Sequence, residues 1–147
     1  MRHHRHSGIV GMLLAASMSV AISTSCNASP CGAVKISTLT QRNIDWETAI
    51  AKQLGAKEVK VLQLFRANPW VIVFVEVPQS DDAFLFYSDD PLTHRYLALW
   101  AGAARASEQN EIQTWVMRNV RGLPRRLRNC FAWYVTSDRG FRRQIKE

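Results

Sequence analysis

The sequence predicts an α+β fold with an N-terminal helix, a four-stranded antiparallel meander and two C-terminal helices. Four short apolar runs, separated by turn-forming residues, fall close together in the middle of the chain. On either side of them, apolar side chains recur at spacings of three and four residues, as they do in helices. The chain has 147 residues, of which 47% are hydrophobic and 21% charged, and this composition is that of an ordinary globular domain.

The apolar runs have the residue types and punctuation of neighbouring antiparallel strands. The link Ala67-Asn68-Pro69 is too short for the helical crossover that parallel strands need. The later links are rich in Pro, Asp and Ser, which favour turns. The second run is rich in β-branched and aromatic residues and barely alternates, so we expect a central strand covered on both faces. The predicted strands are residues 59–66, 70–77, 83–88 and 96–102.

Three helices are predicted around this sheet. The first has acids in its first turn, and Gly55 supplies its stop. Ser107 is the expected N-cap of the second, and Pro124 suits the first turn of the third. Because the last predicted strand is apolar on both sides, the sheet needs a cover on each face. The helices are predicted over residues 45–54, 107–121 and 124–135, and the charged tail, 138–147, is expected to fray.

The first 28 residues have the organisation of an export signal. Arg2 and Arg5 form a positively charged start, residues 9–22 form an apolar core, and small residues follow. The core is shorter than the roughly 20 apolar residues of a membrane-spanning helix, so removal is expected rather than anchoring. We therefore expect a signal peptide over residues 1–28 and one α+β domain over residues 29–147. The mature chain is expected in the periplasm, without a transmembrane segment.

The processing route has alternatives. Cleavage after Ala28 or after Ser25 would leave small residues at the positions that a signal peptidase reads. Lipidation of Cys26 is a third route, and it would give a membrane-anchored lipoprotein. Against it, Ser23 stands where the resembling lipoprotein pattern usually has a branched apolar residue. Secretion out of the cell is a further alternative.

The cysteines predict one disulfide. With Cys26 removed or lipidated, Cys31 and Cys130 remain as an even pair in an oxidising compartment, where pairing is expected. The bridge would close a loop of about 100 residues and stabilise the fold by up to roughly 4.7 kcal/mol in the chain-entropy model. A nucleophilic Cys130 with His94 as its base is disfavoured, because it needs a free thiolate in that compartment.

Basic side chains gather toward the C-terminus. The formal net charge is +7, and residues 118–147 hold nine basic and two acidic side chains. Alone, this cluster would indicate nucleic acid, but export makes that partner unexpected. An anionic envelope surface or an acidic protein remains as a partner, and the alternative is that the charges only solvate a helix face. The candidate binding arginines are Arg121, Arg125, Arg126 and Arg128.

No catalytic, cofactor or metal motif is present: G-x-S-x-G, P-loop, H-E-x-x-H and CxxC patterns are all missing. We therefore predict no catalytic residue, no cofactor and no metal ion. His94 with Asp89 or Asp90 is a candidate acid–base or ligand-binding loop, with ordinary turn chemistry as the alternative. Trp70 and Trp133, if exposed, are candidate interface anchors, since Trp and Arg often dominate binding energy.

The predicted layout of a leader, one compact α+β domain, one disulfide and no catalytic motif resembles that of small exported bacterial inhibitor and immunity proteins. The likeness is one of architecture. It implies a periplasmic binding protein that occludes a protein partner, such as a cell-wall-degrading enzyme or a delivered toxin, through a sheet-end loop and the basic C-terminal helices. The alternatives are a small periplasmic enzyme or ligand-binding domain using His94, and an envelope-associated structural protein held by lipidated Cys26 or by the arginine face.

Overall fold

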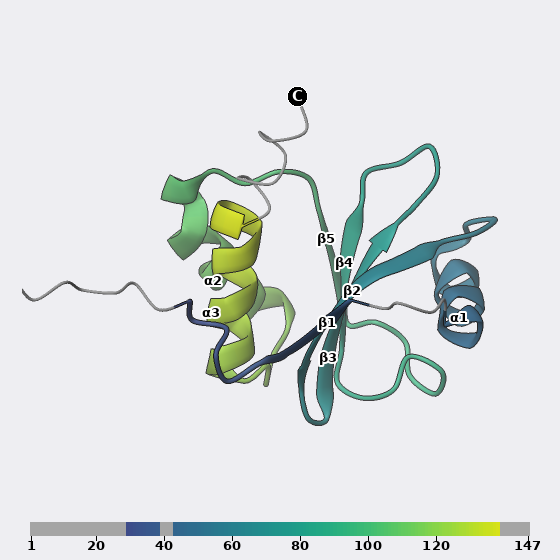
Figure 1. Ribbon diagram of the computed structural model, residues 1–147, viewed down its shortest axis with the longest axis horizontal. Helices are drawn as coiled ribbons and strands as arrows, with labels where there is room; N and C mark the ends of the chain where they lie inside the picture. The colour runs from purple at the N-terminus through teal and green to yellow at the C-terminus, as the bar shows by residue number, and fades with distance from the viewer. Residues whose placement is uncertain (1–28, 39–42, 139–147) are drawn as a thin grey trace, which may run out of the picture.

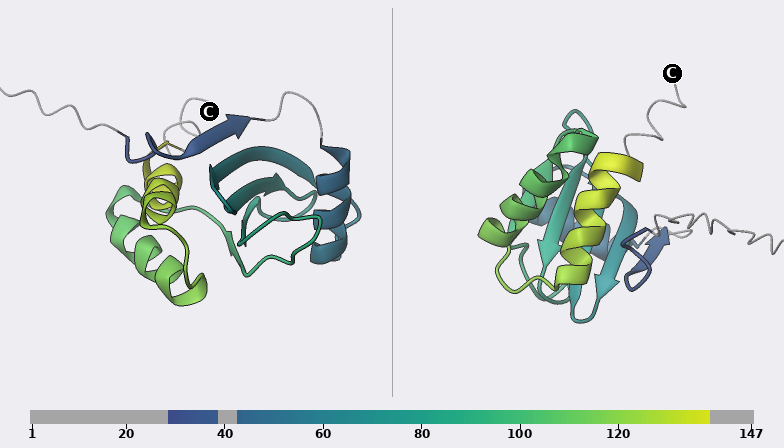
Figure 2. Two further views of the ribbon diagram at one scale, coloured as in Figure 1. Left: turned by 90° about the horizontal axis from the view of Figure 1, so that it is seen from below. Right: turned by 90° about the vertical axis from the view of Figure 1, so that its left-hand side faces the viewer.

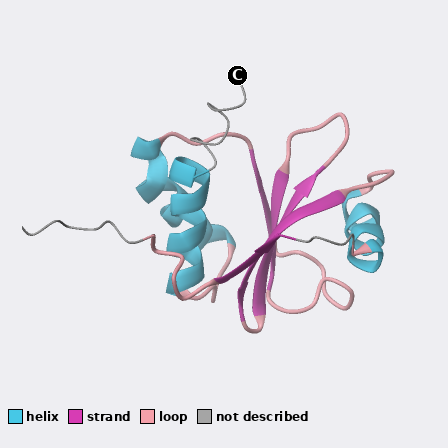
Figure 3. Ribbon diagram, viewed as in Figure 1, coloured by secondary structure: helices cyan, strands magenta, loops and turns pink. Residues whose placement is uncertain are grey.

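A five-stranded antiparallel sheet lies between two helical layers, with α1 on one face and α2 and α3 on the other (Figures 1 and 3). The computed structural model describes residues 29–38 and 43–138, so the expected signal peptide, Cys26 and the end of the charged tail lie outside the described residues. The α+β class, the three helices and the two covers agree with the prediction. The main elements are β1 (Lys35–Thr38), α1 (Ile44–Leu54), β2 (Lys60–Ala67), β3 (Trp70–Glu76), β4 (Ala83–Tyr87), β5 (Ala98–Ala101), α2 (Gln109–Asn119) and α3 (Arg125–Trp133).

The sheet has one strand more than predicted. Its order is β1-β2-β3-β4-β5 with every neighbouring pair antiparallel, so the meander is confirmed and β3 is central as expected. The additional strand, β1, was missed because Ile36 is its one large apolar residue and most of its side chains are exposed. It is an edge strand that forms by pairing with β2. An edge strand of this kind needs no alternation of apolar and polar residues that could be recognised in the sequence.

Each face of the sheet has its own core. Alternation along β3 sends Ile72 and Phe74 to the α2–α3 side, and it sends Val71, Val73 and Val75 to the α1 side. The α2–α3 core is rich in aromatic rings: Phe84 and Phe131 meet edge to face at 5.2 Å between ring centroids. The α1 core is mainly aliphatic. This division explains why β3 is apolar without alternation in the sequence.

Helix α1 is capped at both ends and anchored to the sheet by a buried carboxylate. The Asn43 side chain accepts a hydrogen bond from the Trp46 N–H at 3.1 Å, and Gly55 ends the helix at a φ of 66°, which glycine adopts without strain. Glu47 is buried, and its Oε1 accepts a hydrogen bond from the Val61 N–H at 3.1 Å. That amide lies where the β2–β3 register shifts, so the carboxylate occupies a local irregularity of the ladder.

The C-terminal helices lie side by side across the sheet (Figure 2). Ser107 is not the N-cap of α2, so that prediction was wrong. A 3₁₀ turn, Ala106–Glu108, precedes α2. The Glu108 carboxylate accepts a hydrogen bond from the N–H of Arg105, the residue before this turn, so Glu108 rather than Ser107 supplies the side-chain contact at the start of the helix. Helix α3 continues into a π-helical turn over Tyr134–Asp138, beyond the predicted helix end.

The predicted disulfide is confirmed. Cys31 and Cys130 are joined with their Cα atoms 4.6 Å apart, and the bridge ties the segment before β1 to α3. Both cysteines are buried in the α2–α3 core. Within residues 29–38 and 43–138, no helix is long and apolar enough to cross a membrane.

Candidate binding surface at the turn between β2 and β3

The turn Asn68-Pro69 connects the two longest strands and is exposed at one end of the sheet. Strand register decides what surrounds it. Lys35, at the start of β1, pairs with Arg66, and Tyr87, at the end of β4, pairs with Val71. The segments before β1 and after β4 therefore reach the same end of the sheet as this turn, and the loop after β4 leaves the sheet beside it in Figure 1.

On one side of the turn lies a pocket of about 450 Å³, which we call the basic pocket. Lys35, Arg66 and Arg126 bring three positive charges to it from β1, β2 and the first turn of α3. This is where the basic C-terminal helix meets the sheet-end turn, the two parts that the sequence hypothesis combined. Its lining residues are Ala33, Lys35, Arg66, Ala67, Asn68 and Arg126.

On the other side lies a pocket of about 310 Å³, which we call the aspartate pocket. Arg66 lines this pocket as well, and its guanidinium carbon lies 5.0 Å from the centroid of the Trp46 ring, a cation–π distance. The turn thus forms a ridge between the two pockets, with Arg66 reaching both. The aspartate pocket is lined by Trp46, Arg66, Asn68, Pro69, Trp70, Val71, Asp89 and Asp90.

Asp89 and Asp90 organise the loop that carries them. The Asp89 carboxylate accepts a hydrogen bond from the Asp90 N–H at 2.8 Å, and the Asp90 carboxylate accepts one from the Leu92 N–H at 2.9 Å. His94 is exposed, and its Nδ1 lies 2.9 Å from the Thr93 hydroxyl. These are the contacts of turn chemistry. Among the described residues, the structure joins His94 to neither aspartate through a side-chain hydrogen bond.

A glutamine of α1 holds this loop in place. Gln53 Nε2 donates to the carbonyl oxygens of Pro91 and His94, at 3.0 and 3.1 Å. Its Oε1 accepts from the Tyr87 hydroxyl at 3.0 Å and from the Tyr96 N–H. Burial raises the pKa of Tyr87, and the neighbouring Tyr96 adds to the rise, so the hydroxyl stays a donor. Sequence reasoning missed Gln53, because nothing distinguishes it from any polar helix residue.

Of the remaining predicted site residues, Trp70 is the one that lines a pocket beside the ridge. Trp70 is half-buried beside Gly122, where an added Cβ would lie 3.3 Å from the indole ring, and Trp133 is half-buried against the same core. Neither tryptophan is a freely exposed anchor. Arg121 and Arg125 are exposed and line neither pocket. Arg128 is half-buried, and its Nε has no hydrogen-bond partner in the described part of the chain.

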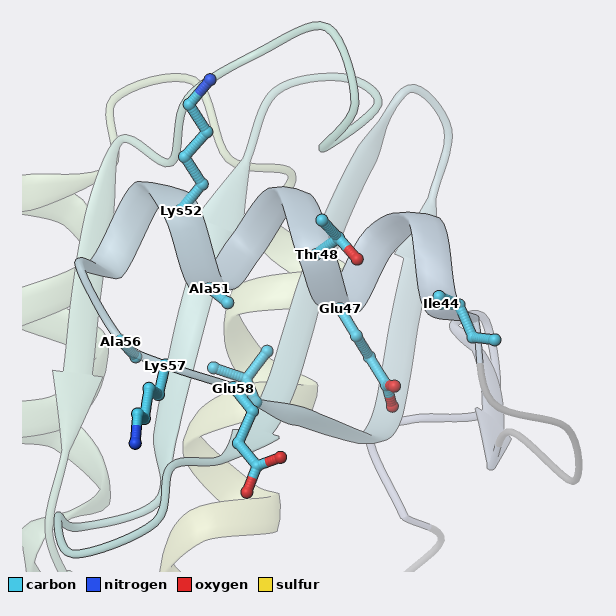
Figure 4. A pocket seen from close by; sticks show the side chains of 9 residues that line it. Ile44, Glu47, Thr48, Ala51, Lys52, Ala56, Lys57 and Glu58 are labelled. Atoms are coloured by element: carbon cyan, nitrogen blue, oxygen red, sulfur yellow. The ribbon is translucent and has the colours of Figure 1, made fainter.

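A further groove of about 320 Å³ runs between α1 and the segment that leads into β2 (Figure 4). Glu47 points from the helix toward β2, where its carboxylate already receives the Val61 N–H. Lys52 points away from the groove, and the leading segment adds Lys57 and Glu58. This groove therefore combines one engaged carboxylate with side chains of both charges.

No family model, curated protein or solved structure matches this chain. Across residues 29–38 and 43–138, no three His, Cys, Asp or Glu side chains gather into a group that could hold a metal ion. The geometry of the ridge and its two pockets is therefore the basis for a functional conclusion.

Proposed function

We propose that this protein is an exported binding protein that occludes a protein partner with the ridge between β2 and β3 and the pockets on its two sides. The observation that carries the proposal is the meeting of Arg126 with Asn68 in one pocket, which places the basic helix and the sheet-end turn on one continuous surface. The export signal expected over residues 1–28 supports a periplasmic location.

The scaffold suits a binding surface because its parts are held rigidly. Asn68 and Pro69 project from two strands that pair over seven register positions, and Arg66 is steadied by the Trp46 ring beneath it. The disulfide ties β1 to the α3 layer, which limits relative motion of the two sides of the basic pocket. A preformed surface loses little conformational entropy on binding, and arginines beside tryptophans are frequent hot spots.

A pull-down from a periplasmic extract tests this function. The wild-type protein should retain a partner at stoichiometric level, and Arg126→Glu should reduce its retention at least tenfold. Arg125→Glu is the matched control, because Arg125 is exposed on the same helical turn but lines neither pocket. The retained partner should also lose activity when the wild-type protein is added. Absence of a stoichiometric partner, or equal loss with the two variants, would overturn the proposal.

A second candidate, a small enzyme or ligand-binding domain, is favoured by one observation. Asp89, Asp90 and Arg66 line the same pocket, next to two tryptophans. If this pocket holds a ligand beside the His94 loop, the double variant Asp90→Ala with His94→Ala should abolish binding or turnover while the melting temperature stays almost unchanged. The third alternative, an envelope-associated structural lipoprotein, rests on Cys26 outside the described residues, and membrane fractionation with and without Cys26 tests it.

A further inference from the structure

The basic pocket is lined by three basic residues, Lys35, Arg66 and Arg126, and its lining contains no acidic residue. We propose that it binds a phosphate group. The inference goes beyond the proposed function, since the anion is a ligand of this chain whether or not a protein partner uses the ridge.

The first argument is the register of β1 on β2. Lys35 stands directly opposite Arg66 in this antiparallel pair. Opposed residues have Cβ atoms about 4.5–5.5 Å apart, and like charges in such positions destabilise the pair. A strand as short and exposed as β1 has few contacts with which to offset that repulsion. An anion bound between the two side chains would convert the repulsion into attraction.

The second argument is that the backbone positions that carry the charges are held in place. Arg66 is half-buried with its guanidinium over Trp46, which limits how far the side chain can swing into solvent. Arg126 is carried by the first turn of α3, which contains no acid, and its side chain is exposed. Cys31 anchors the short segment that leads to Lys35. The backbone positions that carry the three positive side chains at the basic pocket are therefore set before any ligand arrives, and Arg66 is preorganised by its ring contact.

The third argument is that the nearest acids are engaged elsewhere. Asp89 and Asp90 lie across the ridge, in the aspartate pocket, and their carboxylates accept backbone N–H groups of their own loop. In the part of the chain that the structure describes, no ion pair joins Lys35, Arg66 or Arg126 to a carboxylate. Arg66 also borders the aspartate pocket, so Lys35 and Arg126 are the cations whose charge is left for an external anion.

The fourth argument is the match of size and charge. The pocket volume of about 450 Å³ leaves ample room for a phosphate group, because Ala33 and Ala67 are small lining residues. A phosphate monoester carries about −1.5 to −2 charge at neutral pH, so it matches three cations better than a single carboxylate does. Arginine forks bind such oxygens in pairs, and the Asn68 amide adds a neutral donor. The source is either free phosphate or the headgroup of an anionic envelope lipid.

Calorimetric titration of the oxidised full chain with inorganic phosphate, at ionic strength held constant with chloride, tests the site. We expect saturable binding at one site, weakened about tenfold by Arg126→Ala and by a similar factor by Lys35→Gln, as the loss of one charge-assisted contact implies. Arg125→Ala removes the same charge from the same turn outside the pocket, and it should leave the affinity within about twofold. Equal weakening by Arg125→Ala would show only general attraction to a basic protein and would overturn the inference.

A second arm identifies the source of the phosphate. Phosphatidylcholine vesicles containing phosphatidic acid, which presents a phosphate monoester, are compared with vesicles containing phosphatidylglycerol, whose phosphate is a diester. Binding that requires both phosphatidic acid and Arg126 assigns the site to a lipid headgroup, whereas titration by free phosphate alone assigns it to the free anion. Failure of both arms overturns the site. The purified protein suffices for both, so a failed pull-down leaves this result standing.

Discussion

Compared with the α1 face of the sheet, the α2–α3 face is packed by many more aromatic rings. Phe65, Phe84, Phe86 and Phe131 are fully buried there, and the disulfide is buried in the same core. The α1 face is aliphatic, and polar groups such as Glu47 help to attach its helix and loop.

The two faces also differ in coverage. On β5, Trp100 packs into the α2–α3 core, whereas Leu99 on the opposite side of the strand is exposed, and so is Leu97 just before it. Apolar burial stabilises both layers, but on the α1 side directional hydrogen bonds also set where the helix and the loop lie. Substitutions on the two faces should accordingly differ in how much they lower the free energy of unfolding and in how many elements they destabilise.

Phe131→Ala should have the largest effect. The ring contacts Phe84, Phe86 and Trp100, and deleting it leaves a cavity in the aromatic core. We expect a loss of about 4 kcal/mol in the free energy of unfolding, measured by guanidinium denaturation. Met117→Ala, on the exposed face of α2, is the control and should change it by no more than about 0.5 kcal/mol. A loss below about 1 kcal/mol for Phe131→Ala would refute the aromatic layer as the main source of stability.

Removing the disulfide should come next. The double variant Cys31→Ser with Cys130→Ser should unfold with about 3 kcal/mol less free energy, because the unfolded chain regains the freedom of the open loop. Reductant should destabilise the wild-type protein by a comparable amount and leave the double variant unchanged. An equal response of both proteins to reductant would show that the bridge is not formed in solution.

Glu47→Ala tests the polar attachment of the α1 face. The substitution leaves the Val61 N–H buried without its acceptor, which should cost about 2 kcal/mol. Hydrogen exchange should accelerate at Val61 and along α1, but not in α3. Asp45→Ala is the control from the same helical turn, since Asp45 is exposed. Exchange that accelerates equally in α3 would indicate that the two faces do not behave separately.

Tyr87→Phe should have the smallest effect at neutral pH, about 1 kcal/mol for one lost hydrogen bond to Gln53. The dependence of stability on pH in the alkaline range is a more specific test of this substitution. The pKa of Tyr87 in the folded protein is raised above the ordinary 10.0, so at higher pH the unfolded chain loses its proton first. Wild-type stability should therefore fall as pH rises above about 10, and the phenylalanine variant should show a shallower fall. Identical alkaline slopes for the two proteins would contradict the burial of this hydroxyl.

The sequence predicted the helices and the strands β2 to β5 because their signals are local. Apolar period, turn residues and caps are properties of short segments, and Asn68-Pro69 marked its turn directly. The prediction failed where a partner decides the outcome. β1 forms because it can pair with the edge of β2. Ser107 is not the N-cap of α2 because a 3₁₀ turn that ends at Glu108 forms there instead.

The candidate site was predicted only in its separate parts. Trp70, Asp89, Asp90 and Arg126 were named as candidate residues, but nothing in the sequence indicated that they border one ridge. Arg66, which lines both pockets, was missed because a single arginine near the end of a strand carries no pattern of its own. A basic residue at the last positions of a strand, just before a tight turn, is the signal that would have suggested it.

The sequence by itself determined the α+β class, the central place of β3 and the pairing of Cys31 with Cys130, since each follows from residue types, short-range spacing or a count. Only the tertiary structure decided that Lys35 faces Arg66 and that Arg126 joins them beside Asn68. The physical reason is that strand register and helix docking are set by the packing of the whole core. The positions of charged side chains follow from that packing, and no local pattern in the sequence indicates them.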